Sequence, residues 1–125
     1  MDIGQHIKYW AESSDENSEV AKLLLEHGHL GYCLFTAHLA LEKMLKAHVC
    51  KVTGEMPPRI HNLIRLAEMA KLELSKGQVD FLTRLGLFQI EGRYPDTARV
   101  ALDAQTAEDR LSAAQEMLKW LKALL

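Results

Sequence analysis

Long apolar runs are missing from this sequence. None approaches the ~18 residues that a membrane-spanning helix needs, and the opening stretch MDIGQHIKYW lacks a basic segment followed by an apolar core. We therefore expect no membrane association, no cleaved leader and a cytoplasmic location.

Cysteine is scarce, since Cys33 and Cys50 are the only two. Both fall in one expected helix, where 17 residues at about 1.5 Å each place them roughly 25 Å apart, beyond the reach of a disulfide. We expect buried free thiols in a reducing compartment. No CxxC or HExxH motif occurs, and His27 and His29 have no carboxylate at ligand spacing. Neither a metal site nor a cofactor is expected.

An excess of basic charge is also lacking. The net charge is −2, so no sequence-wide field attracts nucleic acid, and strong DNA binding is not expected. The composition, 48% hydrophobic and 26% charged, excludes a disordered chain. A chain of 125 residues can bury a core as one domain, which we expect to span residues 1–125.

No stretch alternates polar and apolar residues with the period of two that a half-buried strand requires. Instead, apolar residues recur every three or four positions, first from Ile3 to His27 around a polar middle, ESSDENSE. That middle permits two interpretations: a break at which Ser13 and Glu16 form a capping box, or one continuous helix, which we favour. Gly28 fits the position just after this helix ends.

The clearest helical pattern extends from about His29 to Val52 and carries a wide apolar stripe, typical of the central helix of a bundle. Gly54 and the Pro57–Pro58 pair end it. Further helices are predicted directly after that pair, from Ser75, and from about Thr106, the expected cap. The sequence therefore predicts an all-α fold, an antiparallel, up-and-down bundle of four to five helices joined by short loops.

Three stretches together resemble one known family. LFTAHLALEKMLKAHV is similar to the A-x-x-A-x-E-K-x-L-K-A segment on the second helix of HEPN domains, the nucleotide-binding helical bundles of prokaryotes and higher eukaryotes. PPRIHNLIRLAEMA resembles that family's P-x-x-H-x-L-x-x-L entry into the third helix, and RYPD resembles the short motif before its last helix. The similarity covers about Tyr9 to Leu125. It implies a bundle of antiparallel helices, commonly a two-fold homodimer in the cytoplasm.

The resemblance also implies three kinds of function. HEPN proteins occur beside minimal nucleotidyltransferases in two-gene modules of the toxin–antitoxin kind, as metal-independent RNase toxins, or as nucleotide-binding domains of larger proteins. The RNase members carry an arginine followed four to six residues later by a histidine. Here no histidine follows any arginine at that spacing, because His61 is the last histidine. We therefore assign no catalytic residue and favour a non-enzymatic protein.

The RYPD stretch has two interpretations. It can be a helix stop, with Tyr94 packed on the core and Arg93 paired with a carboxylate. Alternatively, Arg93 offers a fork of donors suited to phosphate, Tyr94 stacks on a base, and the intervening proline holds Tyr94 and Asp96 at a fixed angle. The resemblance gives the two interpretations similar weight, and both stay open: a helix stop can also hold a polar binding site in place.

Other candidates for the same site lie on the second and third predicted helices. His61 falls in the expected first turn after the proline pair, where it either caps free backbone groups or joins Arg59 near Arg93 around an anionic ligand. Glu42 and Lys46 are four residues apart, which suits an ion pair on a solvated helix face. Alternatively, Lys46 turns toward RYPD and adds a positive charge to that site.

Three hypotheses follow for the function. The favoured one is a non-enzymatic, homodimeric module that binds a nucleotide, RNA or a nucleotidyltransferase partner, within a toxin–antitoxin-like system. The second is an atypical metal-independent ribonuclease in which His61 moves a proton and Arg93 stabilises the developing charge. The third is a structural dimeric scaffold. The favoured hypothesis places the binding site at seven residues: Glu42, Lys46, Arg59, His61, Arg93, Tyr94 and Asp96.

Overall fold

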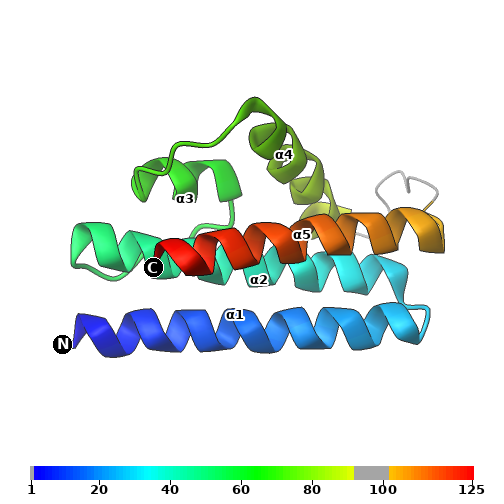
Figure 1. Ribbon diagram of the computed structural model, residues 1–125, viewed down its shortest axis with the longest axis horizontal. Coiled ribbons are helices and arrows are strands. Elements are labelled where there is room, and N and C mark those ends of the chain that lie inside the picture. The colour runs from blue at the N-terminus through cyan, green and yellow to red at the C-terminus, as the bar shows by residue number, and fades with distance from the viewer. Residues whose placement is uncertain (1, 92–101) are drawn as a thin grey trace.

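The computed structural model describes residues 2–91 and 102–125, which form five helices and no strand (Figure 1). This confirms the predicted all-α bundle. The helices are α1 (Ile3–Glu26), α2 (Leu30–Thr53), α3 (Leu63–Met69), α4 (Lys76–Glu91) and α5 (Ala104–Leu124).

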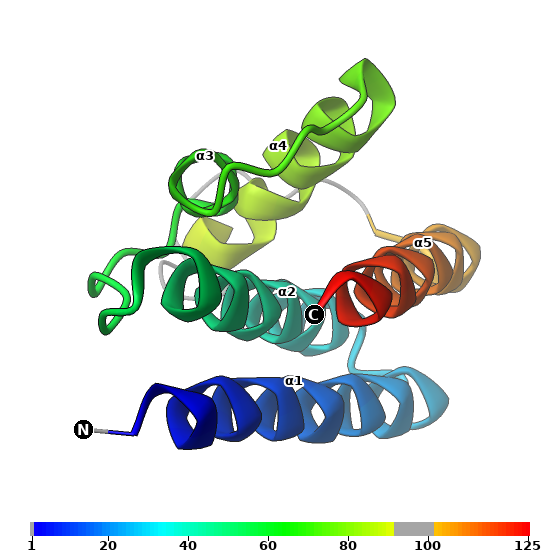
Figure 2. The same cartoon turned by 60° about the vertical axis from the view of Figure 1, so that its left-hand side comes forward.

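The helices form three layers, with α1 on one side, α2 and α5 in the middle, and α3 and α4 on the other side (Figure 2). α1 and α2 are antiparallel neighbours, joined by a tight turn at Gly28, whose φ of +78° is of the kind that favours glycine. α5 runs along α2 in the same direction, because His48 contacts Leu121 and Lys51 contacts Leu124. α2 packs against each of the other four helices, which confirms its predicted central position.

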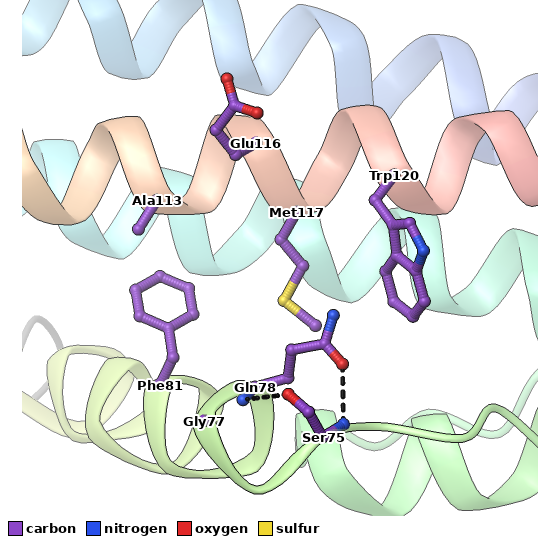
Figure 3. Close-up of a pocket in the computed structure, with 8 residues that line it drawn as sticks. All are labelled: Ser75, Gly77, Gln78, Phe81, Ala113, Glu116, Met117 and Trp120. Carbon is purple, nitrogen blue, oxygen red and sulfur yellow. Dashed lines mark hydrogen bonds between the residues drawn. The ribbon is translucent and has the colours of Figure 1, made fainter.

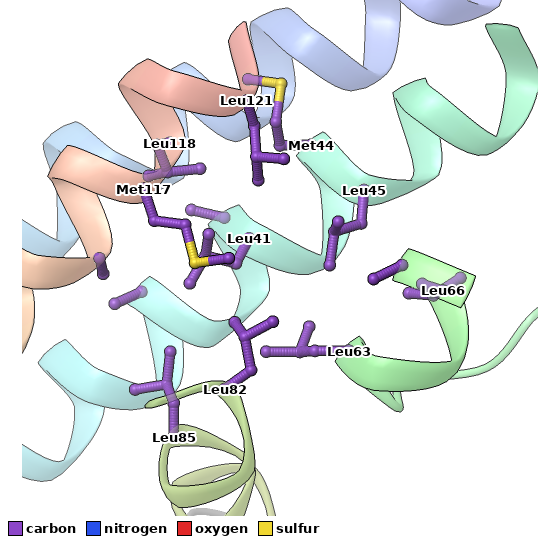
Figure 4. Close-up of a cluster of buried hydrophobic side chains, with 14 of the residues drawn as sticks. Leu41, Met44, Leu45, Leu63, Leu66, Leu82, Leu85, Met117, Leu118 and Leu121 are labelled. Atoms are coloured by element: carbon purple, nitrogen blue, oxygen red, sulfur yellow. The ribbon is translucent and has the colours of Figure 1, made fainter. Parts of the chain in front are cut away.

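The core is built around the apolar residues of α2. Leu41, Met44 and Leu45 lie between α5 on one side and α3 and α4 on the other (Figure 4). Burying one such side chain stabilises the folded chain by about 1.5–3 kcal/mol. The largest fully buried side chains outside α2 are Leu66, Leu82, Leu85 and Leu121.

The polar middle of α1 does not interrupt the helix, so the continuous-helix interpretation is confirmed. Two of its serines face α2 instead of capping a new helix. The Ser14 hydroxyl is buried and donates to the Ala40 carbonyl at 2.7 Å, and Ser13 Oγ accepts from Lys43 Nζ at 2.7 Å. Two residues of the ESSDENSE stretch, Ser13 and Ser14, therefore provide hydrogen bonds between α1 and α2.

Two predicted helix starts are wrong. α3 begins only at Leu63, where the Asn62 side chain accepts from the Arg65 amide at 3.0 Å, so His61 precedes the helix instead of lying in its first turn. α5 begins after Asp103, whose carboxylate accepts from the Thr106 amide at 2.7 Å, so Thr106 is not the cap. An N-cap side chain accepts from the second or third amide of the helix, and Asn62 and Asp103 each accept from the third.

The start of α4 at Ser75 is confirmed. Ser75 Oγ accepts from the Gln78 amide at 3.1 Å, and Gln78 Oε1 accepts from the Ser75 amide at 2.8 Å. This reciprocal pair is a capping box, which satisfies two backbone donors that a helix start leaves free.

His48 of α2 is buried where α2 packs against α5. Its Nε2 donates to the Leu121 carbonyl at 2.7 Å. Burial lowers the pKa of His48 below its ordinary value of 6.5, and the nearby Lys51 ammonium lowers it further, against the opposing effect of the Leu121 carbonyl. The neutral ring is thus the form that fits the folded protein.

This lowered pKa predicts a pH-dependent stability. Because the folded chain binds the His48 proton less readily than the unfolded chain, stability is present above the unfolded pKa and is lost as the pH falls through 6.5 toward the folded value. We expect the urea midpoint of the wild type to fall between about pH 7 and pH 5, and that of His48→Gln to fall less. His27→Gln, which changes an exposed histidine, serves as control and should follow the wild type. If the urea midpoint of His48→Gln falls as much as that of the wild type, His48 is not the source of the pH dependence.

Candidate functional site

One stripe of α2 carries three ionisable side chains. His38, Glu42 and Lys46 are spaced by four residues and so lie on the same side of the helix. All three residues are buried, with exposed fractions between 2% and 6%. The solvated-face interpretation of Glu42 and Lys46 is therefore wrong. Glu42 and Lys46 are buried because α2 is the central helix and has neighbours in both outer layers.

The Glu42 carboxylate is the centre of this group. Its Oε2 accepts from Lys46 Nζ at 3.1 Å, and its Oε1 accepts from His61 Nδ1 at 3.0 Å. His38 Nδ1 lies 4.0 Å from the same Oε1. A buried charge is costly unless it is paired, and here both carboxylate oxygens have partners. We call these four residues, His38, Glu42, Lys46 and His61, the polar cluster.

His61 connects the polar cluster to solvent. Its side chain is 44% exposed, and it lies in the segment 54–62 between α2 and α3. Because its Nδ1 is held by Glu42, its Nε2 is the ring atom left for a ligand. Arg59, two residues earlier in that segment, is exposed.

α1 adds aromatic residues on the other side of Lys46. The Lys46 ammonium lies over the Trp10 ring, 5.5 Å from its centroid, a cation–π distance. The Tyr9 and Trp10 rings meet edge to face, with centroids 5.3 Å apart. Trp10 also lines a surface hollow of about 390 Å³ together with Gln5, His6, Tyr9 and Met56. We call this the aromatic hollow.

Sequence reasoning missed the aromatic hollow. Tyr9 and Met56 are far apart in sequence, and no motif joins them. Tyr9 is 60% exposed in the structure, an unusual place for a large aromatic ring, but the sequence alone does not reveal this exposure.

Of the seven site residues proposed from the sequence, the structure brings Glu42, Lys46 and His61 together. Arg93, Tyr94 and Asp96 lie outside the described residues. Asp15 of α1 forms an ion pair with Lys122 of α5 at 2.7 Å and is not part of this group.

A second hollow, of about 460 Å³, lies between the start of α4 and α5 (Figure 3). Phe81, Met117 and Trp120 project into it from the two helices. Two of its polar groups, the Ser75 hydroxyl and the Gln78 amide oxygen, already form the cap of α4. This hollow contains none of the proposed site residues, so we place the candidate site at the polar cluster.

The cysteines do not contribute to the site. Cys33 and Cys50 are buried free thiols, as predicted, and burial raises the pKa of Cys33 to about 11. Since the thiolate is the reactive form, Cys33 is an inert core residue. Within residues 2–91 and 102–125, no group of three or more histidine, cysteine or acidic residues is arranged to hold a metal ion. No helix in the described part of the chain has the length and hydropathy to cross a bilayer.

These features define a helical bundle. Its central helix carries the buried polar cluster, which reaches solvent through His61. The family model of the HEPN domain matches residues 7–124, so the chain belongs to the HEPN domain family. The crystal structure of TT1696 from Thermus thermophilus has the same fold, with a TM-score of 0.80 over 95% of this chain and 98% of that chain, at 24% sequence identity. No curated protein matches the sequence.

Because Glu42 and Lys46 are both buried, removing one of the two charges should destabilise the fold far more than removing both. Glu42→Leu leaves the buried Lys46 ammonium without its carboxylate and should lower the free energy of unfolding by about 3–5 kcal/mol. Glu42→Leu combined with Lys46→Met removes both charges and should lose much less. Urea unfolding measures both.

The control is the ion pair of Lys8 and Glu12, which has the same spacing but side chains that are 75% and 66% exposed. Glu12→Leu should change the free energy of unfolding by less than about 1 kcal/mol. If Glu42→Leu costs no more than Glu12→Leu, the pair does not stabilise the fold as its burial indicates.

Proposed function

We propose that this HEPN domain binds the phosphate group of a nucleotide at His61, without chemically transforming it. The observation that carries the proposal is the 3.0 Å hydrogen bond between Glu42 and His61 Nδ1, which fixes a half-exposed imidazole at the rim of a buried cluster. A ring held in this way presents Nε2 to a ligand in one orientation, which lowers the entropy lost on binding.

The charges of the polar cluster suit an anionic ligand. The Lys46 ammonium offsets the Glu42 carboxylate, so a protonated His61 leaves the cluster with a net positive charge at its exposed end. A hydrogen bond from a cationic ring to phosphate is charge-assisted and therefore stronger than a neutral one. Arg59 is exposed two residues away and supplies a second donor group.

The remaining elements of the proposal rest on family membership. According to the proposal, Arg93, Tyr94 and Asp96 border the same ligand, and the chain acts as a cytoplasmic homodimer. A minimal nucleotidyltransferase encoded beside it, in a toxin–antitoxin-like module, is the protein partner that the HEPN family assignment favours.

Thermal melting against a panel of ribonucleoside mono- and triphosphates tests the phosphate contact. A ligand at a hundred times its dissociation constant stabilises a protein by about 2.7 kcal/mol, which raises the midpoint of a domain of this size by several degrees. We expect one nucleotide to do so for the wild type and for His27→Ala, an exposed control, but not for His61→Ala. Equal stabilisation of His61→Ala would refute the role of His61, and Arg93→Ala tests the predicted contribution of the RYPD stretch.

The same hydrogen bond favours one second candidate, a metal-independent ribonuclease. A histidine whose Nδ1 is oriented by a carboxylate is suited to proton transfer at Nε2. This candidate predicts that RNA incubated with the protein acquires 2′,3′-cyclic phosphate ends, and that His61→Ala abolishes them. The binding proposal predicts no such ends above the background of His61→Ala.

A further inference from the structure

The aromatic hollow lies between the first turns of α1 and the segment that follows α2. Gln5, His6, Tyr9 and Trp10 line it from α1, and Met56 lines it from the segment 54–62. Its volume of about 390 Å³ is in the range of about 300–1,000 Å³ found for small-ligand sites. Tyr9 and Met56 are both exposed, so solvent reaches the groups that line the hollow.

Contacts between side chains link the aromatic hollow to the polar cluster. Trp10 lines the hollow and is 5.5 Å from the Lys46 ammonium, and Lys46 shares the Glu42 carboxylate with His61. Met56 and His61 also belong to the same short segment. Lys46 and Glu42 thus connect the hollow to His61, the proposed phosphate contact.

The side chains of the hollow have the chemistry of a base-binding site. Tyr9 and Trp10 provide aromatic rings at an interplanar angle of 69°, so a planar ring that stacks on one meets the edge of the other. Met56 adds a polarizable thioether, and Gln5 adds an amide that can donate to and accept from the edge of a base. The Trp10 indole nitrogen is buried and has no hydrogen-bond partner among the described residues, so Trp10 contributes its ring to the hollow and not its N–H group.

From this arrangement we infer that the aromatic hollow binds the base of a nucleotide. The inference rests on the proposed function, in which His61 binds the phosphate, and adds a second contact region for the same ligand. Stacking on aromatic rings is the usual way in which proteins hold an unpaired base, and it tolerates different bases because each has a π-face. The hollow between α4 and α5 is a poorer fit, because its serine and glutamine already cap α4 and its one ionisable group is acidic, Glu116.

The first experiment uses Trp10 as the reporter. Trp120→Phe removes the only other tryptophan, so the fluorescence of that variant comes from the ring that lines the hollow. Titration with adenosine, guanosine, cytidine and uridine should give saturable quenching with at least one nucleoside. Ribose 5-phosphate, which has no base, should give none. Absence of saturable quenching by all four nucleosides would overturn the inference.

The second experiment compares two matched variants in the same background. Tyr9→Ala removes an aromatic ring of the hollow, and Tyr32→Ala removes a ring of similar exposure, 64% against 60%, at the start of α2. Tyr9→Ala should weaken nucleoside binding about tenfold, whereas Tyr32→Ala should leave it unchanged. Both residues are exposed, and circular dichroism checks that both variants fold. Equal weakening by the two substitutions would overturn the inference.

The outcomes separate this inference from the proposed function. If nucleotides bind and depend on His61 while nucleosides do not quench Trp10, the phosphate contact stands and the base site is wrong. If nucleosides bind through Tyr9 but the corresponding nucleotides bind no more tightly, the base site stands and the role of His61 is wrong.

Discussion

The structure depends on one constraint: α2 packs against all four other helices of the described chain, so few of its residues can face water. Its apolar residues supply much of the core, and its polar residues are buried with them. A buried polar group without a partner destabilises a protein, which means that each of these residues must find one within the fold. The pairing of Glu42 with Lys46 and His61 is a direct result of where α2 lies.

These buried polar contacts also fix how the layers are aligned. Apolar packing is non-directional, so leucines alone would tolerate small shifts of one helix along another. A hydrogen bond does not, because its length and angle are restricted. The hydrogen bond from Ser14 to the Ala40 carbonyl thus fixes the position of α1 along α2. The bond from His48 to the Leu121 carbonyl does the same for α2 and α5, and the bond between Glu42 and His61 does it for α2 and the segment 54–62. The last of these contacts also forms the candidate site.

Local patterns in the sequence predicted most of the helices, including the central place of α2 and the continuity of α1. Cap positions were harder: Asp103 is a better acceptor than Thr106, and α3 begins after the Asn62 cap, so His61 lies outside that helix. The burial of Glu42 and Lys46 could not be predicted, because their spacing is the same as that of the exposed pair Lys8 and Glu12. Only the packing of the other helices distinguishes the two pairs.

The parallel pairing of α2 with α5 has a consequence for how the chain folds. α1 and α2 are joined by a tight turn, so they can associate as soon as both are made. The contact between His48 and Leu121 joins residues 73 positions apart, and it closes a loop that includes α3 and α4. Until α5 docks, the apolar side of α2 that it covers is exposed to water. During synthesis on the ribosome, the N-terminal hairpin therefore carries an uncovered apolar surface until the last helix emerges, and this interval is when the chain is most prone to aggregate.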